Sequence, residues 1–216
     1  MATRQQLEDA YIDHVLTRGE RPVSVYVFAK DQGITEQEFY DHFASFDAIE
    51  AAVWTESVET TIQQAQGQEV WNGYSAREKA LSFFYSYTEY LKSKRSFVVY
   101  SLKQIPPGFL TPAVMKGAKE LFDVFANEVI QQGLESKELE DRPFFAKRYK
   151  DGLWAQFVFI LNFWVKDSST GFEKTDEAIE KGVNLTFDLY QRSPIDSMLE
   201  YGKFLAQNAG FNFSHK

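Results

Sequence analysis

Residues 24–49 read SVYVFAKDQGITEQEFYDHFASFDAI, and this stretch decides the fold. Ser24 and Thr35 are residue types that cap helix N-termini, and each precedes a short segment with helical spacing of its apolar residues. Gly33 lies between the two segments and allows the positive φ that a tight turn needs. The apolar side chains that can pack against a further helix, expected over residues 5–18, are Phe28, Ile34, Phe39 and Phe43. The stretch therefore predicts two short helices joined by a tight turn, a helix-turn-helix.

The rest of the chain is also punctuated as helices. A long helix is expected from Asp47 to about Gln66, and capping residues, Gly or Pro mark most of the later boundaries. The later helices are expected over residues 75–94, 97–104, 112–133, 143–166, 175–191 and 194–209. No segment alternates apolar and polar residues as a strand does, and no hairpin dipeptide occurs. We therefore predict an all-α protein of about ten helices, with a three-helix unit at residues 1–46 and a larger helical bundle at residues 47–216.

The composition excludes several kinds of chemistry. The chain has 216 residues, a net charge of −8 and no cysteine, so disulfides, thiol catalysis and cysteine-ligated zinc are ruled out. The three histidines, His14, His42 and His215, lack the spacing of metal ligands. No Ser-His-Asp order, glycine-rich phosphate loop or paired-carboxylate motif is recognisable. We therefore expect a protein that is not an enzyme, with no metal site and no cofactor.

Two further features concern location. The longest apolar run, GLWAQFVFILNFWV at residues 152–165, contains two polar side chains and is too short to span a bilayer. The N-terminal residues MATRQQLEDAYIDH contain no apolar signal core. We therefore expect no membrane span and a cytoplasmic location.

The stretch at residues 24–49 resembles the helix-turn-helix of the TetR family of transcriptional regulators. The positions that fit the family pattern are Ser24, Phe28, Ala29, Asp31, Gly33, Ile34, Thr35, Tyr40, His42 and Phe43. The resemblance implies a DNA-binding-like domain at residues 1–46 and a ligand-binding and dimerisation domain at residues 47–216. It implies contacts of Thr35, Tyr40 and His42 with DNA phosphates. It also implies a ligand-responsive regulator that works as a homodimer, joined through helices near residues 144–166 and 175–192.

The charge of the N-terminal unit departs from the family pattern. Residues 1–60 contain four basic side chains and twelve acidic ones, a difference equal to the whole net charge of the chain. Glu36, Glu38 and Asp41 stand where family members usually carry basic or small residues, and Phe46 stands where they usually carry a lysine. Phosphate neutralisation supplies most nonspecific DNA affinity. The sequence therefore predicts weak or absent DNA binding at physiological salt.

Aromatic residues make up 16% of the chain. Ligand pockets are lined by aromatic and apolar side chains with a few polar groups, although each of these residues also suits an ordinary core. The candidate ligand-binding residues are Phe84, Tyr87, Tyr100, Phe122, Phe125, Trp154, Phe157 and Asn162. We expect them to bind a small hydrophobic ligand in the larger domain.

Three functions remain open at this stage. The resemblance favours a ligand-responsive transcriptional regulator. The acidic N-terminal unit also fits a lipid- or isoprenoid-binding accessory protein that has kept the fold and lost DNA binding. A third alternative is an adaptor whose acidic unit meets a basic protein. The apolar helices near 152–165 and 175–192 predict a homodimer in all three cases, because a monomer would expose both.

Overall fold

The computed structural model describes residues 2–105, 111–142 and 146–191. Within these ranges the chain forms nine α-helices and no strand, which confirms the all-α fold. The α-helices are α1 (Arg4–Arg18), α2 (Val25–Asp31), α3 (Glu36–Tyr40), α4 (Phe46–Gln66), α5 (Ala76–Lys92), α6 (Arg95–Lys103), α7 (Lys116–Glu135), α8 (Tyr149–Lys166) and α9 (Glu173–Tyr190). Four short 3₁₀ segments lie at Trp71–Gly73, Ala113–Met115, Ala146–Arg148 and Thr170–Phe172. The helix expected after Pro194 lies outside the described residues.

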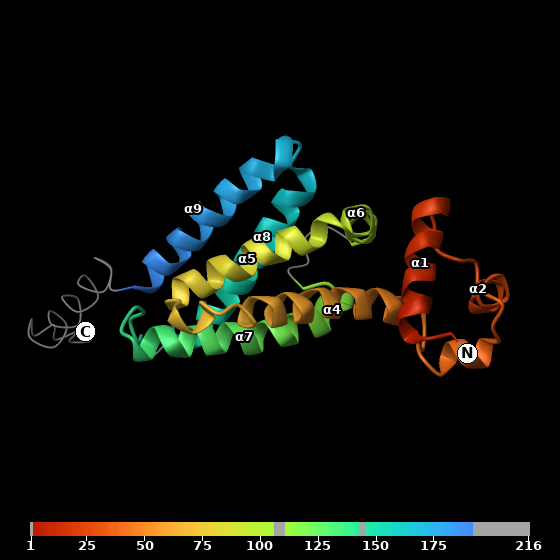
Figure 1. Cartoon of the computed structure of the whole chain (residues 1–216), viewed down its shortest axis with the longest axis horizontal. Coiled ribbons are helices and arrows are strands. Elements are labelled where there is room, and N and C mark those ends of the chain that lie inside the picture. Colours follow the sequence, from red (N-terminus) through yellow and green to blue (C-terminus); the bar gives the residue numbers. More distant parts are fainter. Residues whose placement is uncertain (1, 106–110, 143–145, 192–216) are drawn as a thin grey trace, which may run out of the picture.

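The helices form a small N-terminal unit and a larger bundle (Figure 1). Helices α1, α2 and α3 lie together at one end of the molecule, and α4 runs from them into the bundle beside α7. Helices α5 and α7 both pack against α4, while α8 packs against α7 and α9. Helix α6 packs back against α1, so the two units meet at two places, through α4 and through α6.

The N-terminal unit forms as its sequence predicts. Ser24 caps α2, and Thr35 forms a capping box with Glu38 at the start of α3. Gly33 has a φ of 68° in the turn between the two helices, the conformation for which glycine is suited. The buried core of this unit consists of Leu7, Tyr11, Val15, Phe28, Phe39, Phe43, Ile49, Val53 and Phe97, with Ile34 packed against it. The expected burial of the apolar residues of the motif is thus confirmed.

That core extends beyond residue 46. Ile49 and Val53 belong to α4, and Phe97 belongs to α6. The N-terminal unit is therefore completed by residues of the following segments. A division of the chain into domains at residue 46 stays a prediction.

Several predicted helix ends are wrong by a few residues. Helix α4 begins one residue early, because Ser45 rather than Asp47 lies at the cap. Gly133 lies inside α7, where a Cβ would come 2.7 Å from the side chain of Leu139, so this glycine permits close packing and does not end the helix. The α-helix predicted from Pro143 begins at Tyr149, and its predicted start lies outside the described residues.

Two further predicted starts are also wrong. Thr175 does not cap a helix but lies inside α9, where its N–H and hydroxyl donate to Asp167 Oδ2 at 2.9 and 2.7 Å. The segment after Thr111 and Pro112 begins with a 3₁₀ turn, and α7 starts only at Lys116. In both places the polar side chain bonds a residue outside the predicted helix start: Thr175 bonds Asp167, and the Thr111 hydroxyl accepts from Trp154 Nε1 at 2.9 Å.

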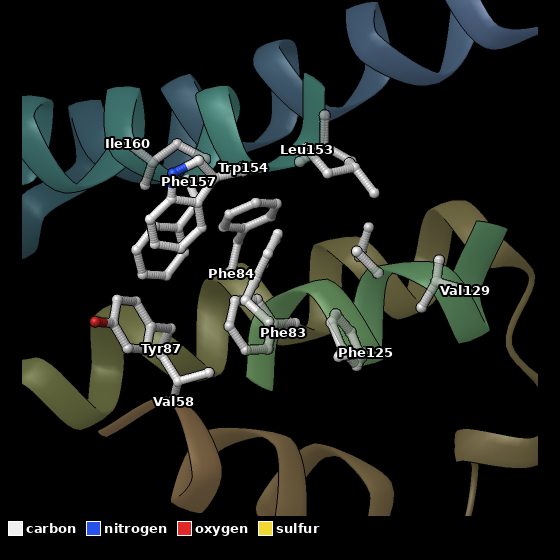
Figure 2. Packing of buried hydrophobic residues seen from close by; sticks show 14 of the residues in the cluster. Val58, Phe83, Phe84, Tyr87, Phe125, Val129, Leu153, Trp154, Phe157 and Ile160 are labelled. Atoms are coloured by element: carbon white, nitrogen blue, oxygen red, sulfur yellow. The ribbon is translucent and has the colours of Figure 1, made fainter. Parts of the chain in front are cut away.

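The core of the larger bundle is built from aromatic rings in direct contact (Figure 2). The ring centroids of Trp154 and Phe157 are 4.7 Å apart, and those of Tyr87 and Phe157 are 4.9 Å apart. Phe83 and Phe125 are likewise separated by 4.9 Å. Such edge and offset contacts add to the free energy that burial of the rings contributes.

We predict that Phe125→Ala lowers the free energy of unfolding by about 3–5 kcal/mol, because the ring is buried and its loss leaves a cavity. The adjacent Val124→Ala, at an exposed position of α7, is expected to change it by less than about 0.5 kcal/mol. Urea denaturation at one fixed protein concentration measures both. Equal effects of the two substitutions would contradict this account of the core.

Candidate functional site at the junction of the two units

The three residues predicted to contact DNA differ in whether their polar groups already form hydrogen bonds within the N-terminal unit. Tyr40 is 53% exposed on α3. The hydroxyl of Thr35 is occupied at the helix start, where it accepts from the Glu38 N–H at 3.1 Å and donates to the Glu38 carboxylate at 3.1 Å. His42 Nε2 donates to the carbonyl oxygen of Ala2 at 3.0 Å. Of the three, Tyr40 is the one whose polar group makes no hydrogen bond among the described residues, and its ring packs edge-on against Phe39.

The acidic residues of α3 have different roles. The Glu38 carboxylate accepts from the N–H and the hydroxyl of Thr35, and these bonds hold its pKa below the usual value. Glu38 is therefore a capping residue of α3. Glu36 and Asp41 are exposed and remain on the outer surface of the helix.

Two of the four cations in residues 1–60 are engaged inside the unit. Arg4 Nε lies 3.3 Å from Glu8, and its guanidinium lies 4.3 Å above the Phe43 ring. Arg21 binds both Asp47 and Glu50, at 2.7 and 2.8 Å. Internal pairing therefore leaves Arg18 and Lys30 as the cations of this unit without an ion pair among the described residues.

Phe46 occupies the position of the family's phosphate-binding lysine. Its ring stacks on that of Tyr11 at 5.3 Å and meets the edge of Phe28 at 5.5 Å. The side chain is partly buried and packs against the N-terminal core. Replacing the lysine with phenylalanine thus gives the unit additional packing at the cost of a cation.

Glu50 is the centre of a buried hydrogen-bond network. Its side chain is 1% exposed. Oε1 accepts from the Tyr11 hydroxyl at 2.6 Å and from Arg21 Nε and Nη2 at 3.0 and 2.8 Å. Oε2 accepts from the Ser101 hydroxyl at 3.3 Å, and that hydroxyl accepts from Trp54 Nε1 at 3.0 Å. These partners join α1, the loop after it, α4 and α6 into one junction.

The junction perturbs Tyr11 in the direction that burial dictates. Burial and the hydrogen bond to Glu50 raise the pKa of the Tyr11 phenol, so it stays protonated and donates. Sequence reasoning missed this site, because it treated Glu50 only as one of the twelve acidic side chains of residues 1–60. A detectable signal was its place between the apolar residues Ile49 and Val53 on one helix.

A cavity of about 490 Å³ opens beside this network. Its polar lining is Arg21, Asp47, Glu50, Ser101 and Gln104. Its apolar lining is Ile105, Pro112, Ala113 and Val114. The walls thus come from the N-terminal unit, from the end of α6 and from the segment before α7, and the volume falls in the range of small-molecule sites.

A second buried carboxyl group lies elsewhere between α1 and α4. Glu8 is 3% exposed, and burial is the main cause that raises its pKa to about 7. The charge of Glu56 and a hydrogen bond with it act in the same direction, while Arg4 and Lys94 oppose the shift. A proton on Glu8 is therefore favoured near neutral pH.

The predicted ligand-binding residues do not surround the junction cavity. Six of them, Phe84, Tyr87, Phe122, Phe125, Trp154 and Phe157, are buried and pack against one another. Tyr100 packs beside the N-terminal core. Asn162 is exposed on α8, where its Nδ2 donates to the carbonyl oxygen of Val158 at 2.8 Å.

Helices α8 and α9 also carry exposed apolar side chains. Phe159, Leu185 and Leu189 are 54%, 61% and 52% exposed. Part of the apolar run at 152–165 is therefore left uncovered within its own chain, as expected for a helix that is apolar on every side. Gly182 allows α9 to approach α8 closely, because a Cβ there would collide with the side chain of Gln156.

The described residues lack two further features, a cluster of metal ligands and a membrane-spanning helix. Among them, no three His, Asp or Glu side chains come together as metal ligands would. None of their helices is long and apolar enough to cross a membrane.

The described chain thus joins a helix-turn-helix, a unit that many transcriptional regulators use, to a larger helical bundle. The family described as "Tetracyclin repressor-like, C-terminal domain" matches residues 79–205, more than half of the chain. The chain therefore belongs to the TetR family and has the fold of its regulators.

Solved structures agree with this assignment. A protein from Shewanella sp. PV-4 assigned to the TetR family of transcription regulators is 15% identical, with a TM-score of 0.60 over 89% of this chain and 100% of its own. A protein of unknown function from Rhodococcus sp. RHA1 is 13% identical, with a TM-score of 0.59 over 89% and 97%. A regulatory protein of the TetR family from Rhodococcus RHA1 is 12% identical, with a TM-score of 0.52 over 88% and 97%. Among curated proteins, no sequence matches this one.

We predict that Glu8 makes stability fall as pH rises from about 4.5 to about 7, because the folded protein holds a proton that the unfolded chain releases. Glu8→Gln keeps a neutral side chain at every pH, so its stability relative to the parent protein should increase across this interval. Thermal unfolding at pH 5, 6, 7 and 8 measures the difference. Glu59→Gln, at an exposed position of α4, is the control, and a parallel shift in both variants would refute the assignment.

Proposed function

We propose that this chain is a homodimeric, ligand-responsive regulatory protein whose N-terminal unit does not hold operator DNA at physiological salt. The observation that carries the proposal is the charge of α3. Glu36 and Asp41 are exposed on it, while Arg4 and Arg21 are engaged within the unit. A protein gains DNA affinity by neutralising phosphates and releasing counterions, and this surface opposes that exchange.

Thr35, Tyr40 and His42 stay the proposed phosphate contacts, should DNA be bound. None of the three is a lysine or arginine, the residues whose charge neutralises phosphates and releases counterions. Thr35 and His42 would also have to give up the bonds described above. In a dimer both half-sites would meet the same acidic face.

The dimer is proposed to form through α8 and α9. The support is the set of exposed apolar side chains on these helices, Phe159, Leu185 and Leu189. Pairing with a second copy would remove them from water, which is the main source of favourable free energy in such interfaces. The family's four-helix interface, formed by the corresponding helices, is consistent with this surface.

A second candidate function is favoured by the aromatic core. A lipid- or isoprenoid-binding accessory protein would use Phe84, Tyr87, Phe122, Phe125, Trp154 and Phe157 as ligand-binding residues, together with Tyr100 and Asn162. These rings pack closely against one another, so a hydrophobic ligand would have to separate them. A lipid that co-purifies with the protein in native mass spectrometry would favour this function over the first.

We predict that the parent protein shows no sequence-specific DNA binding at physiological salt. A variant with Glu36→Lys, Gln37→Lys and Asp41→Lys should gain salt-sensitive affinity, because three exposed positions of α3 then offer cations to phosphates. Phe46 is left unchanged because it packs in the core. Binding to random duplexes at low and physiological salt is the measurement.

The matched control is Glu128→Lys, Gln131→Lys and Glu135→Lys on α7, which changes the net charge equally at exposed positions of the bundle. If the control gains as much affinity as the α3 variant, net charge alone decides. Nanomolar, sequence-specific binding by the parent protein would overturn the proposal.

We predict that Leu185→Glu and Phe159→Glu each shift the protein from dimer to monomer, because a charge at the centre of an apolar interface must be desolvated. Sedimentation velocity at micromolar concentration detects the change in mass. Val124→Glu, on an exposed site of α7, should leave the dimer intact. A parent protein that sediments at 25.0 kDa would show that no such dimer exists.

A further inference from the structure

The junction cavity combines a suitable volume with a wall of net negative charge. Two carboxylates, those of Asp47 and Glu50, line it together with one guanidinium, that of Arg21. Arg21 binds both carboxylates, at 2.7 and 2.8 Å, and so neutralises one of the two charges. One negative charge therefore remains on the cavity wall.

The two oxygen atoms of Glu50 are unequally occupied. Oε1 accepts three hydrogen bonds, from Tyr11 and Arg21. Among the described residues, Oε2 accepts one, from Ser101, at the long distance of 3.3 Å. A carboxylate oxygen removed from water has a strong need for donors, so Oε2 retains capacity for a further one.

The opposite part of the lining is apolar. Ile105 and Val114 are half-buried, and Pro112 is buried, at the end of α6 and before α7. Gln104 adds an amide that accepts or donates beside them. A ligand that suits both parts has a cationic donor group at one end and a small apolar body at the other.

We propose that the junction cavity binds a small organic cation, such as a primary amine with an apolar body. Its ammonium group donates to Glu50 Oε2 and to Asp47, and it balances the charge that Arg21 leaves. Its body contacts Ile105, Pro112 and Val114. An anion of the same shape meets repulsion, and a neutral analogue leaves the carboxylate unbalanced.

The proposal rests on the proposed function and names the ligand class of the regulator. A ligand in this cavity touches the N-terminal unit through Arg21 and the bundle through the end of α6. It therefore binds one relative placement of the two units better than others, which is the requirement for any ligand that shifts a conformational equilibrium.

The test uses three probes of similar shape: 2-phenylethylamine, 3-phenylpropanoate and 2-phenylethanol. Isothermal titration calorimetry and thermal unfolding of the full chain at pH 7 measure binding. The amine should bind saturably and raise the unfolding temperature, since a ligand that binds only the folded state stabilises it. The carboxylate should not bind, and the alcohol should bind at least about tenfold more weakly, as for the loss of a charge-assisted hydrogen bond.

Two variants locate the site. Asp47→Asn removes one charge at a largely exposed side chain and should weaken amine binding about tenfold. Ala113→Trp fills the apolar side of the cavity from an exposed position and should abolish it. Glu128→Gln, on α7 outside the cavity, should leave amine affinity unchanged.

Three outcomes would overturn the proposal: no amine binding up to about 10 mM, equal binding of the carboxylate, or unchanged amine affinity in both cavity variants. Ammonium chloride at the same concentration serves as the control for charge without an apolar body. Failure here leaves the sedimentation and DNA-binding results of the proposed function as they stand, so the two hypotheses fail separately.

Discussion

The burial of the Glu50 carboxylate constrains the rest of the structure. Removing a carboxylate from water costs several kcal/mol unless donors replace the lost hydration. The donors here are Tyr11 on α1, Arg21 in the next loop and Ser101 on α6. No one helix could supply them, so the placement of the N-terminal unit against the bundle is tied to one buried charge. Apolar packing through Phe97 holds the same helices together without specifying their orientation so narrowly.

The same pairing explains the unusual surface of the N-terminal unit. The cations that would serve a nucleic-acid interface are used internally, Arg21 at the junction and Arg4 against Glu8 and Phe43. Phe46 contributes its ring to the core in place of a cation. Each exchange strengthens contacts within the unit and removes positive charge from its outer face. Stability of the unit and affinity for phosphates thus draw on the same few positions.

Local patterns sufficed to predict the helix-turn-helix. Ser24, Gly33 and Thr35 act within a few residues along the chain, so their roles follow from the sequence. Such local patterns do not predict contacts between residues far apart in the sequence. Glu50 looked like one more surface charge because its donors lie 29 to 51 residues away. Gly133 looked like a helix end because the leucine that packs against it is contributed by the following loop.

The candidate ligand site shows the same limit. The aromatic residues of the bundle were correctly expected to cluster, but composition does not distinguish rings that fill their own space from rings around a cavity. The junction cavity is lined by residues of ordinary type from distant segments. The packing of α6 against α1, and of the 3₁₀ segment Ala113–Met115 against α4, brings those segments together.

The length of helix α4 amplifies small changes in its tilt. It has 21 residues without interruption, so at about 1.5 Å per residue it forms a stiff rod about 30 Å long. One end carries the N-terminal unit, and the other lies between α5 and α7. A tilt of about 5° about the inner end displaces the outer end by about 2.6 Å, from the rod length alone. In a symmetric pair of chains the separation of the two outer ends changes by up to twice that amount. A very small rearrangement in the bundle thereby changes this separation by up to about 5 Å, from the rod length alone.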